Sequence, residues 1–167
     1  MQKQLVEANF KIIRTFLQQN AKLIVQTNPR SDWTYNSFEE LVLSEGQEMA
    51  SIPLPNSIEA GLPRNCYFNC RQALNEHPEL NYCEGYALAI DYVLPVPHAW
   101  LVNSSGEALD PTWQTPAAYV GVAFDRGWLY SFLSSRNRDY LAVFEANHLE
   151  NYSLLWQGLP YEALLRE

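Results

Sequence analysis

The amino-acid sequence predicts a single α+β domain, and three observations lead to this prediction. The chain has 167 residues, about one domain's worth, and 47% of them are hydrophobic against 18% charged, as in compact globular proteins. Near the N-terminus, hydrophobic residues recur every three or four positions, which is the period of an α-helix. In the middle of the chain, runs rich in Val, Tyr, Leu and Trp flank a polar turn, which is typical of antiparallel strands.

The N-terminal third predicts two helices followed by a loop. Ser37 lies three residues before a glutamate and predicts a capped second helix that ends near Gly46. The stretch 52–63 is rich in Pro and Gly, which forbids regular helix and predicts an extended surface loop. The first helix is expected over 4–25, with a break near Asn20. Its apolar positions are Leu5, Val6, Phe10, Ile13, Phe16, Leu17, Leu23 and Ile24.

The rest of the chain predicts a mixture of helices and strands. A helix is expected over 65–77 with Asn65 as its N-cap, and 82–94 predicts one long strand or a bent pair. Farther on, we expect a strand over 119–124, a helix over 128–135, a strand over 140–145 and a closing helix over 152–165. No repeat or linker divides the chain, so 1–167 is treated as one domain. It consists of an N-terminal helical and Pro-rich segment (1–61), a core (62–125) and C-terminal helices with a strand (126–167).

The charge of the chain restricts its partners. Nineteen acidic and eleven basic side chains give a net charge of -8, which repels phosphate backbones and anionic lipids. Neither nucleic acid nor a membrane is therefore expected as a partner. No segment has the apolar length that a bilayer needs, and the first residues lack an apolar leader region, so we expect a cytoplasmic protein. Three cysteines are an odd number, which predicts at least one free thiol.

A β-hairpin is predicted over 98–113, with Ser104-Ser105-Gly106 as a three-residue loop. Such a loop pairs Asn103 with Glu107, the residues on either side of it. Counting back along both strands from this pair places His98 opposite Thr112. His98 and Asp110 then lie on the same face as diagonal neighbours, roughly 7–8 Å apart. A register shifted by one residue would place them on opposite faces, so the pairing depends on this parity.

Cys66 lies in the first turn of the helix expected over 65–77. A cysteine attacks as its thiolate, which the N-terminus of a helix favours. Cys70 lies one turn farther from that end, and we expect it to be a core residue. Cys66, His98 and Asp110 therefore occur in the chain order of a nucleophile, its general base and the carboxylate that orients the base. This order predicts cysteine-based amide or ester chemistry, with the Cys66 N–H contributing to an oxyanion hole.

The helix with Cys66, the His98-Ala99-Trp100 strand and Asp110-Pro111-Thr112 resemble the core of the transglutaminase-like superfamily, a branch of the papain-like cysteine-enzyme fold. The resemblance covers roughly residues 62–113. Val102 departs from it, because many relatives have an acidic residue two places after the Trp. Arg64 departs as well, because relatives often have a glycine two residues before the nucleophile.

The resemblance implies a Cys-bearing helix packed on an antiparallel sheet whose adjacent strands carry the His and the Asp. It also implies amide-bond chemistry by a Cys66–His98–Asp110 triad through a thioester, as in peptidases, deamidases and transglutaminases. The substrate would be the carboxamide of a peptide or protein. We expect hydrolysis rather than crosslinking, because transfer to an amine requires a site that excludes water and the sequence indicates none.

Each of these residues also has an ordinary structural interpretation. A free cysteine is usually a small buried hydrophobe, and an aspartate before proline is common in turns. Trp100 and Trp113 are interpreted primarily as core residues. A second use for either of them is to line the catalytic groove. Glu84 is more often a solvated strand-end residue and is not assigned to the site. The alternative function is an inactive module of the same fold that binds a peptide or serves as a scaffold.

We expect neither a metal nor a cofactor. Cys66 and Cys70 are separated by three residues, which lacks the short loop spacing of a zinc knuckle. The other potential ligands are scattered along the chain, namely His77, Cys83 and His148.

Overall fold

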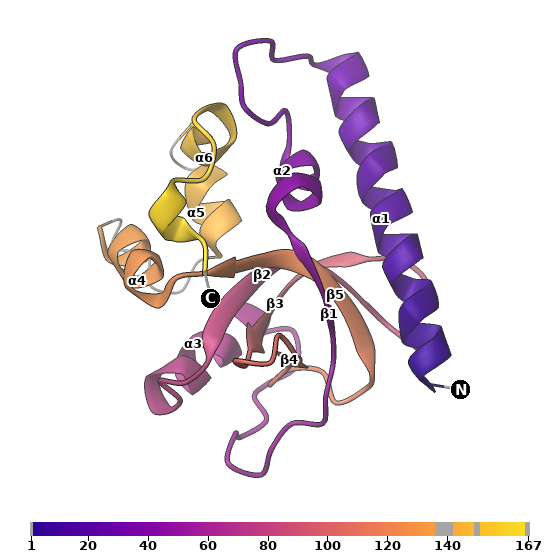
Figure 1. The fold of residues 1–167 in the computed structure, drawn as a ribbon, viewed down its shortest axis with the longest axis vertical. Helices are drawn as coiled ribbons and strands as arrows, with labels where there is room; N and C mark the ends of the chain where they lie inside the picture. The colour runs from indigo at the N-terminus through magenta and orange to yellow at the C-terminus, as the bar shows by residue number, and fades with distance from the viewer. Residues whose placement is uncertain (1, 136–141, 149–150, 166–167) are drawn as a thin grey trace.

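The computed structural model describes residues 2–135, 142–148 and 151–165, and it has the expected α+β architecture (Figure 1). A curled sheet of five antiparallel strands has the order β1-β5-β2-β3-β4. The strands are β1 (Gln47–Ala50), β2 (Asn81–Ala89), β3 (Val96–Val102), β4 (Ala108–Leu109) and β5 (Ala117–Phe124). In Figure 1, α1 (Gln2–Thr27) lies along one side of the molecule, and α2 (Phe38–Glu45) lies in the middle. The opposite side has α4 (Arg126–Ser134), α5 (Val143–His148) and α6 (Ser153–Trp156).

Glycines allow the sheet to curl at its centre. Gly85 of β2 pairs directly with Gly121 of β5. A Cβ atom at Gly121 would lie 2.4 Å from the Trp100 ring and 2.5 Å from the Glu84 carbonyl oxygen. The two strands and the indole therefore come closer together than any larger residue would permit.

The two edges of the sheet also meet. Ser51, just after β1, forms a parallel bridge with Ala108 of β4. The Ile52 N–H donates to the Ala108 carbonyl oxygen at 2.9 Å. The sheet therefore curls far enough for its first and last strands to become neighbours. The sequence analysis did not predict β1.

The first helix, α1 (Gln2–Thr27), runs without the expected break. The Asn20 side chain donates to the Phe16 carbonyl oxygen at 2.8 Å, so it follows the helix instead of interrupting it. Leu5 and Leu23 were expected on the buried face but are about half exposed, at 47% and 55%. The buried stripe consists of Val6, Phe10, Ile13, Leu17 and Ala21. It packs against the sheet and the second helix.

The next two helices are confirmed. In α2 (Phe38–Glu45), the Ser37 hydroxyl accepts from the Glu40 N–H at 3.2 Å, and Gly46 ends the helix. The stretch 52–63 contains no helix or strand, as expected. Helix α3 (Cys66–Glu76) starts after Asn65, and it packs on β2 and β3.

The C-terminal predictions are partly wrong. Helix α4 (Arg126–Ser134) lies close to the helix expected over 128–135. In the middle of the chain, β2 ends at Ala89, five residues before the end of the strand expected over 82–94. Where a strand was expected over 140–145, the structure has α5 (Val143–His148), while 140 and 141 lie outside the described residues. The reason is long-range, because the Glu84 carboxylate accepts the N–H groups of Val143 and Phe144 at 2.7 and 3.0 Å and so starts a helix.

The closing helix expected over 152–165 is also wrong. It is divided into α6 (Ser153–Trp156) and the 3₁₀ helix η1 (Tyr161–Ala163). Gly158 has a φ of 85° and Pro160 follows it, and neither conformation continues an α-helix.

Apolar residues pack on both faces of the sheet. The larger cluster lies between one face and the helices. The smaller cluster lies on the other face, enclosed by the curl, and contains Met49, Cys83, Ala87, Ala89, Trp100, Val102, Ala108, Ala117 and Tyr119. Within it, the Trp100 indole N–H donates to the Met49 sulfur at 3.2 Å. No helix in the described part of the chain is both long and apolar enough to cross a bilayer.

Candidate active site

Cys66 is the first residue of α3 and is 8% exposed. Its position follows from the sequence, because a turn at Pro63 and Arg64 precedes it and the apolar spacing of a helix follows. At the first helical position its N–H has no partner within the helix. The thiol therefore lies at the positive end of an eleven-residue helix, which is the end that favours a thiolate.

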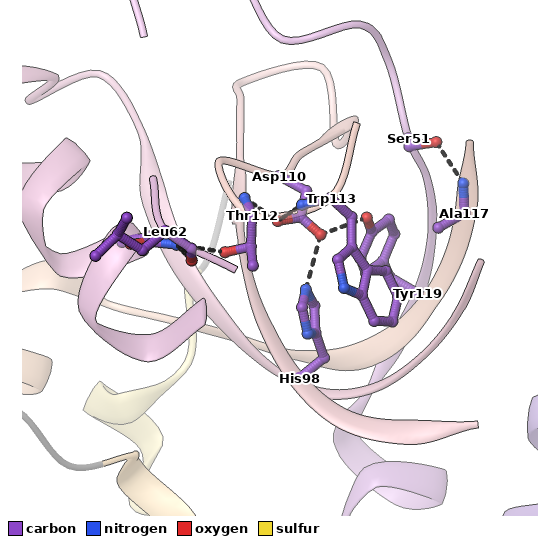
Figure 2. A network of polar contacts seen from close by, with 9 residues as sticks. Ser51, Leu62, His98, Asp110, Thr112, Trp113, Ala117 and Tyr119 are labelled. Atoms are coloured by element: carbon purple, nitrogen blue, oxygen red, sulfur yellow. Dashed lines mark hydrogen bonds and ion pairs between the residues drawn. The ribbon is translucent and has the colours of Figure 1, made fainter. Parts of the chain in front are cut away.

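His98 lies in β3 and is 3% exposed. Its Nε2 atom is 2.7 Å from Oδ2 of Asp110 (Figure 2). This leaves Nδ1 as the ring nitrogen that is not bonded to Asp110, and Cys66 lines the same pocket as His98. The structure therefore brings together all three residues that the sequence analysis selected.

Asp110 directly follows β4 and uses both of its carboxylate oxygens. Besides His98, the Tyr119 hydroxyl donates to Oδ2 at 2.8 Å. The backbone N–H groups of Thr112 and Trp113 donate to Oδ1 at 2.7 and 3.1 Å. Figure 2 shows these donors arranged around the carboxylate. Four donors fix the orientation of Asp110 and so fix the His98 ring.

The predicted hairpin register is confirmed near the loop. Asn103 donates to the Glu107 carbonyl oxygen at 3.2 Å, and Gly106 has a φ of 75°. The ladder then stops after the pair Leu101–Leu109, so the expected pairing of His98 with Thr112 is wrong. Pro111 has no N–H for a ladder, and the Asp110 side chain binds the next two N–H groups, which turns the chain out of the strand.

Two aromatic side chains hold the His98–Asp110 pair. The Trp113 ring stacks on the imidazole with 4.0 Å between centroids and 22° between planes. The Tyr119 hydroxyl reaches Asp110 from β5. From the sequence, a place at the groove was only a second use of Trp100 or Trp113, and Tyr119 was missed. Only the strand order brings β5 next to β2 and within reach of this carboxylate, and no local pattern in the sequence indicates it.

Asn69 was also missed, although it lies one turn after Cys66 on the same helix face. Its amide donates to the Leu62 carbonyl oxygen at 2.8 Å and to the Thr112 hydroxyl at 2.9 Å. The Gly61 N–H donates to the Pro111 carbonyl oxygen at 2.7 Å. These bonds join the helix of Cys66 to the turn that carries Asp110.

The charge of His98 follows from its partners. Burial of the ring favours the neutral form, but the hydrogen bond to Asp110 and the interaction with Cys66 outweigh it and raise the pKa of His98 to about 9. At neutral pH the imidazole is therefore protonated on both nitrogens. A cationic imidazole next to a cysteine favours its thiolate form.

The three cysteines have different surroundings. All are free, and Cys70 and Cys83 are fully buried. Burial raises the pKa of both of these thiols well above the usual range. Cys66 instead lines a pocket of about 400 Å³ together with His98, Thr112, Trp113 and Tyr92. A small molecule can therefore approach the thiol and the imidazole from the same side.

Over residues 2–135, 142–148 and 151–165, no three His, Cys, Asp or Glu side chains gather closely enough to hold a metal ion. The chain matches no family model, no curated protein and no solved structure.

Proposed function

We propose that this protein is a cysteine-dependent amide-bond enzyme with a papain-like core, in which Cys66 is the nucleophile, His98 the general acid and base, and Asp110 the residue that orients His98. The observation that carries the proposal is the His98 ring. Its Nε2 is bonded to Asp110 at 2.7 Å and its Nδ1 is left for a cysteine at a helix N-terminus. An activated thiol requires this arrangement, in which a carboxylate orients the imidazole and the imidazole faces the thiol.

The reaction would proceed in two steps. The Cys66 thiolate attacks the carbonyl carbon, and the developing oxyanion is stabilised by the Cys66 N–H. The C–N bond breaks as protonated His98 gives its proton to the leaving amine, which leaves a thioester. His98 then takes a proton from water, the water oxygen attacks the thioester, and Cys66 leaves as the thiolate with release of a carboxylic acid. An amine in place of water would give a crosslinked product, but we favour hydrolysis.

The backbone before Cys66 supports the transglutaminase-like resemblance. Arg64 has a φ of 65°, in the left-handed region that glycine adopts without steric cost. This is the position at which relatives of that superfamily often have glycine. The conformation therefore agrees with the resemblance although the residue does not.

The test is the rate of alkylation by iodoacetamide between pH 5 and 9, with the modified cysteines identified by mass spectrometry. We expect Cys66 to react at pH 6 to 7 at least about tenfold faster than glutathione, because only a thiolate reacts. His98→Ala should abolish this advantage, whereas the matched variant His77→Ala should retain it. Cys70 and Cys83 should stay unmodified while the protein is folded.

If the folded protein reacts at Cys66 no faster than glutathione, the proposal of an enzyme is wrong. The alternative, an inactive module that binds a peptide in the same groove, would then be preferred. If Cys66 is activated, a screen of glutamine amides and peptides should release ammonia or a new amine, and Cys66→Ala should abolish this release.

A further inference from the structure

A second cavity adjoins the candidate active site. It has a volume of about 360 Å³ and shares two lining residues, Tyr67 and Pro97, with the pocket of Cys66 and His98. Tyr67 directly follows Cys66 in the chain, and Pro97 directly precedes His98. A substrate group next to a carbonyl at Cys66 therefore has this cavity within reach.

Several aromatic residues line the cavity. Four aromatic residues line it, namely Phe38, Tyr67, Tyr86 and Phe144, and we call it the aromatic pocket. The rings of Phe38 and Phe144 stack with 4.6 Å between centroids and 19° between planes. These residues give the cavity an aromatic wall.

The charged groups of the aromatic pocket are mainly acidic. Glu84, Glu145 and His148 line it, and none of its described lining residues is a lysine or arginine. Glu84 is 2% exposed, and its described donors are the Tyr82 hydroxyl and the N–H groups of Val143 and Phe144, none of which carries a charge. Burial raises the pKa of Glu84 to about 7, and that of Tyr67 rises through burial and the nearby Glu84 charge.

We infer that the aromatic pocket binds a basic side chain, arginine or lysine, of a peptide substrate, placed next to the carbonyl that Cys66 attacks. The position of that carbonyl rests on the proposed function. Aromatic faces attract a cation, and arginine stacks on them while its aliphatic stem lies along apolar walls. Glu145 supplies the counter-charge, and a bound cation favours the ionised form of the nearby Glu84. The net charge of -8 also attracts basic peptides to the protein.

The first test measures binding alone. N-acetyl-arginine amide and its neutral analogue N-acetyl-citrulline amide are titrated into the Cys66→Ala protein by calorimetry. We expect arginine to bind about tenfold more tightly than citrulline. Glu145→Gln and Phe144→Leu should reduce this ratio, and Glu162→Gln, at an exposed glutamate outside the pocket, should not. Equal binding of the two amides would overturn the inference.

The second test measures labelling of Cys66 in the protein without substitutions by arginyl and citrullinyl chloromethyl ketones. We expect the arginyl reagent to react faster, and Glu145→Gln to remove the difference. Equal rates, together with His98-dependent alkylation by iodoacetamide, would overturn the inference but leave the proposed function intact. If the protein prefers arginine amide but Cys66 is unreactive, the result would support binding of a basic side chain in the aromatic pocket. It would contradict the proposed enzyme activity.

Discussion

At the scale of single residues, the site depends on one carboxylate. Asp110 accepts from His98, Tyr119 and two backbone N–H groups, so neither of its oxygens is free to turn. A carboxylate held in this way does not need to reorganise when His98 gains or loses a proton. It therefore stabilises the charged imidazole more effectively than an aspartate that is free to rotate.

Asp110→Asn should lower the pKa of His98 by about one to two units, because the opposite charge is lost while burial of the ring remains. The measurement is an NMR titration of the imidazole signals in both proteins. Asparagine keeps the size of the side chain and one carbonyl oxygen, so the turn at 111–113 should be retained. An unchanged pKa would show that His98 is not paired with Asp110 in solution.

At the scale of elements, local patterns were predictable and long-range pairings were not. The loop Ser104-Ser105-Gly106 determines the hairpin parity, and Ser37 with Glu40 starts a helix, since both signals lie within a few residues. The strand β1 is recognisable only through its partner β5. The helix α5 begins where Glu84, some sixty residues earlier, caps its N–H groups.

The same distinction applies to the candidate site. The order of Cys66, His98 and Asp110 can be read directly from the sequence. The predicted hairpin register places His98 and Asp110 on the same face. Tyr119 and Asn69 reach the site through strand order and helix docking, which no short window contains. The aromatic pocket was not foreseen either, because its walls come from α2, α3, β2, β3 and α5. Glu84, set aside as a solvated strand-end residue, is buried.

The close approach of β2, β3 and β5 gives a prediction for the sheet. Gly121→Ala should lower the free energy of unfolding by about 2–4 kcal/mol, because the new Cβ meets a backbone oxygen and a buried indole, neither of which can move easily. Gly127→Ala, in α4, is the matched control. Its Cβ would meet only the Asp125 carboxylate at 3.2 Å, so it should be neutral or gain up to about 1 kcal/mol. Urea unfolding of the three proteins measures both effects, and equal stabilities would contradict the close packing.

At the scale of the whole molecule, two buried groups with raised pKa values, Glu84 and His98, make stability depend on pH between 5 and 9. The folded-state pKa of Glu84 is raised from 4.5 to about 7, and that of His98 from 6.5 to about 9. At a pH between the two pKa values of a group, the folded protein holds a proton that the unfolded chain has released. The free energy of unfolding should therefore fall as pH rises from 5 to 9, by an amount on the order of 3 kcal/mol for each group.

Urea unfolding at pH 5, 7 and 9 tests this dependence. The folded protein should be most stable at pH 5 and least stable at pH 9. Glu84→Gln should flatten the change between pH 5 and 7 and leave the change between pH 7 and 9, which belongs to His98. A stability that rises with pH would show that neither group is held in its protonated form.

The meeting of the two sheet edges has a consequence for how the chain behaves in a crowded solution. Edge strands expose backbone groups that can template pairing with another polypeptide. Here the edges are strands of four and two residues, and the bridge from Ser51 to Ala108 turns them toward each other. Little flat backbone is thus left at these edges for a second copy to extend. Even at high concentration the sheet should resist growth into strand-paired aggregates.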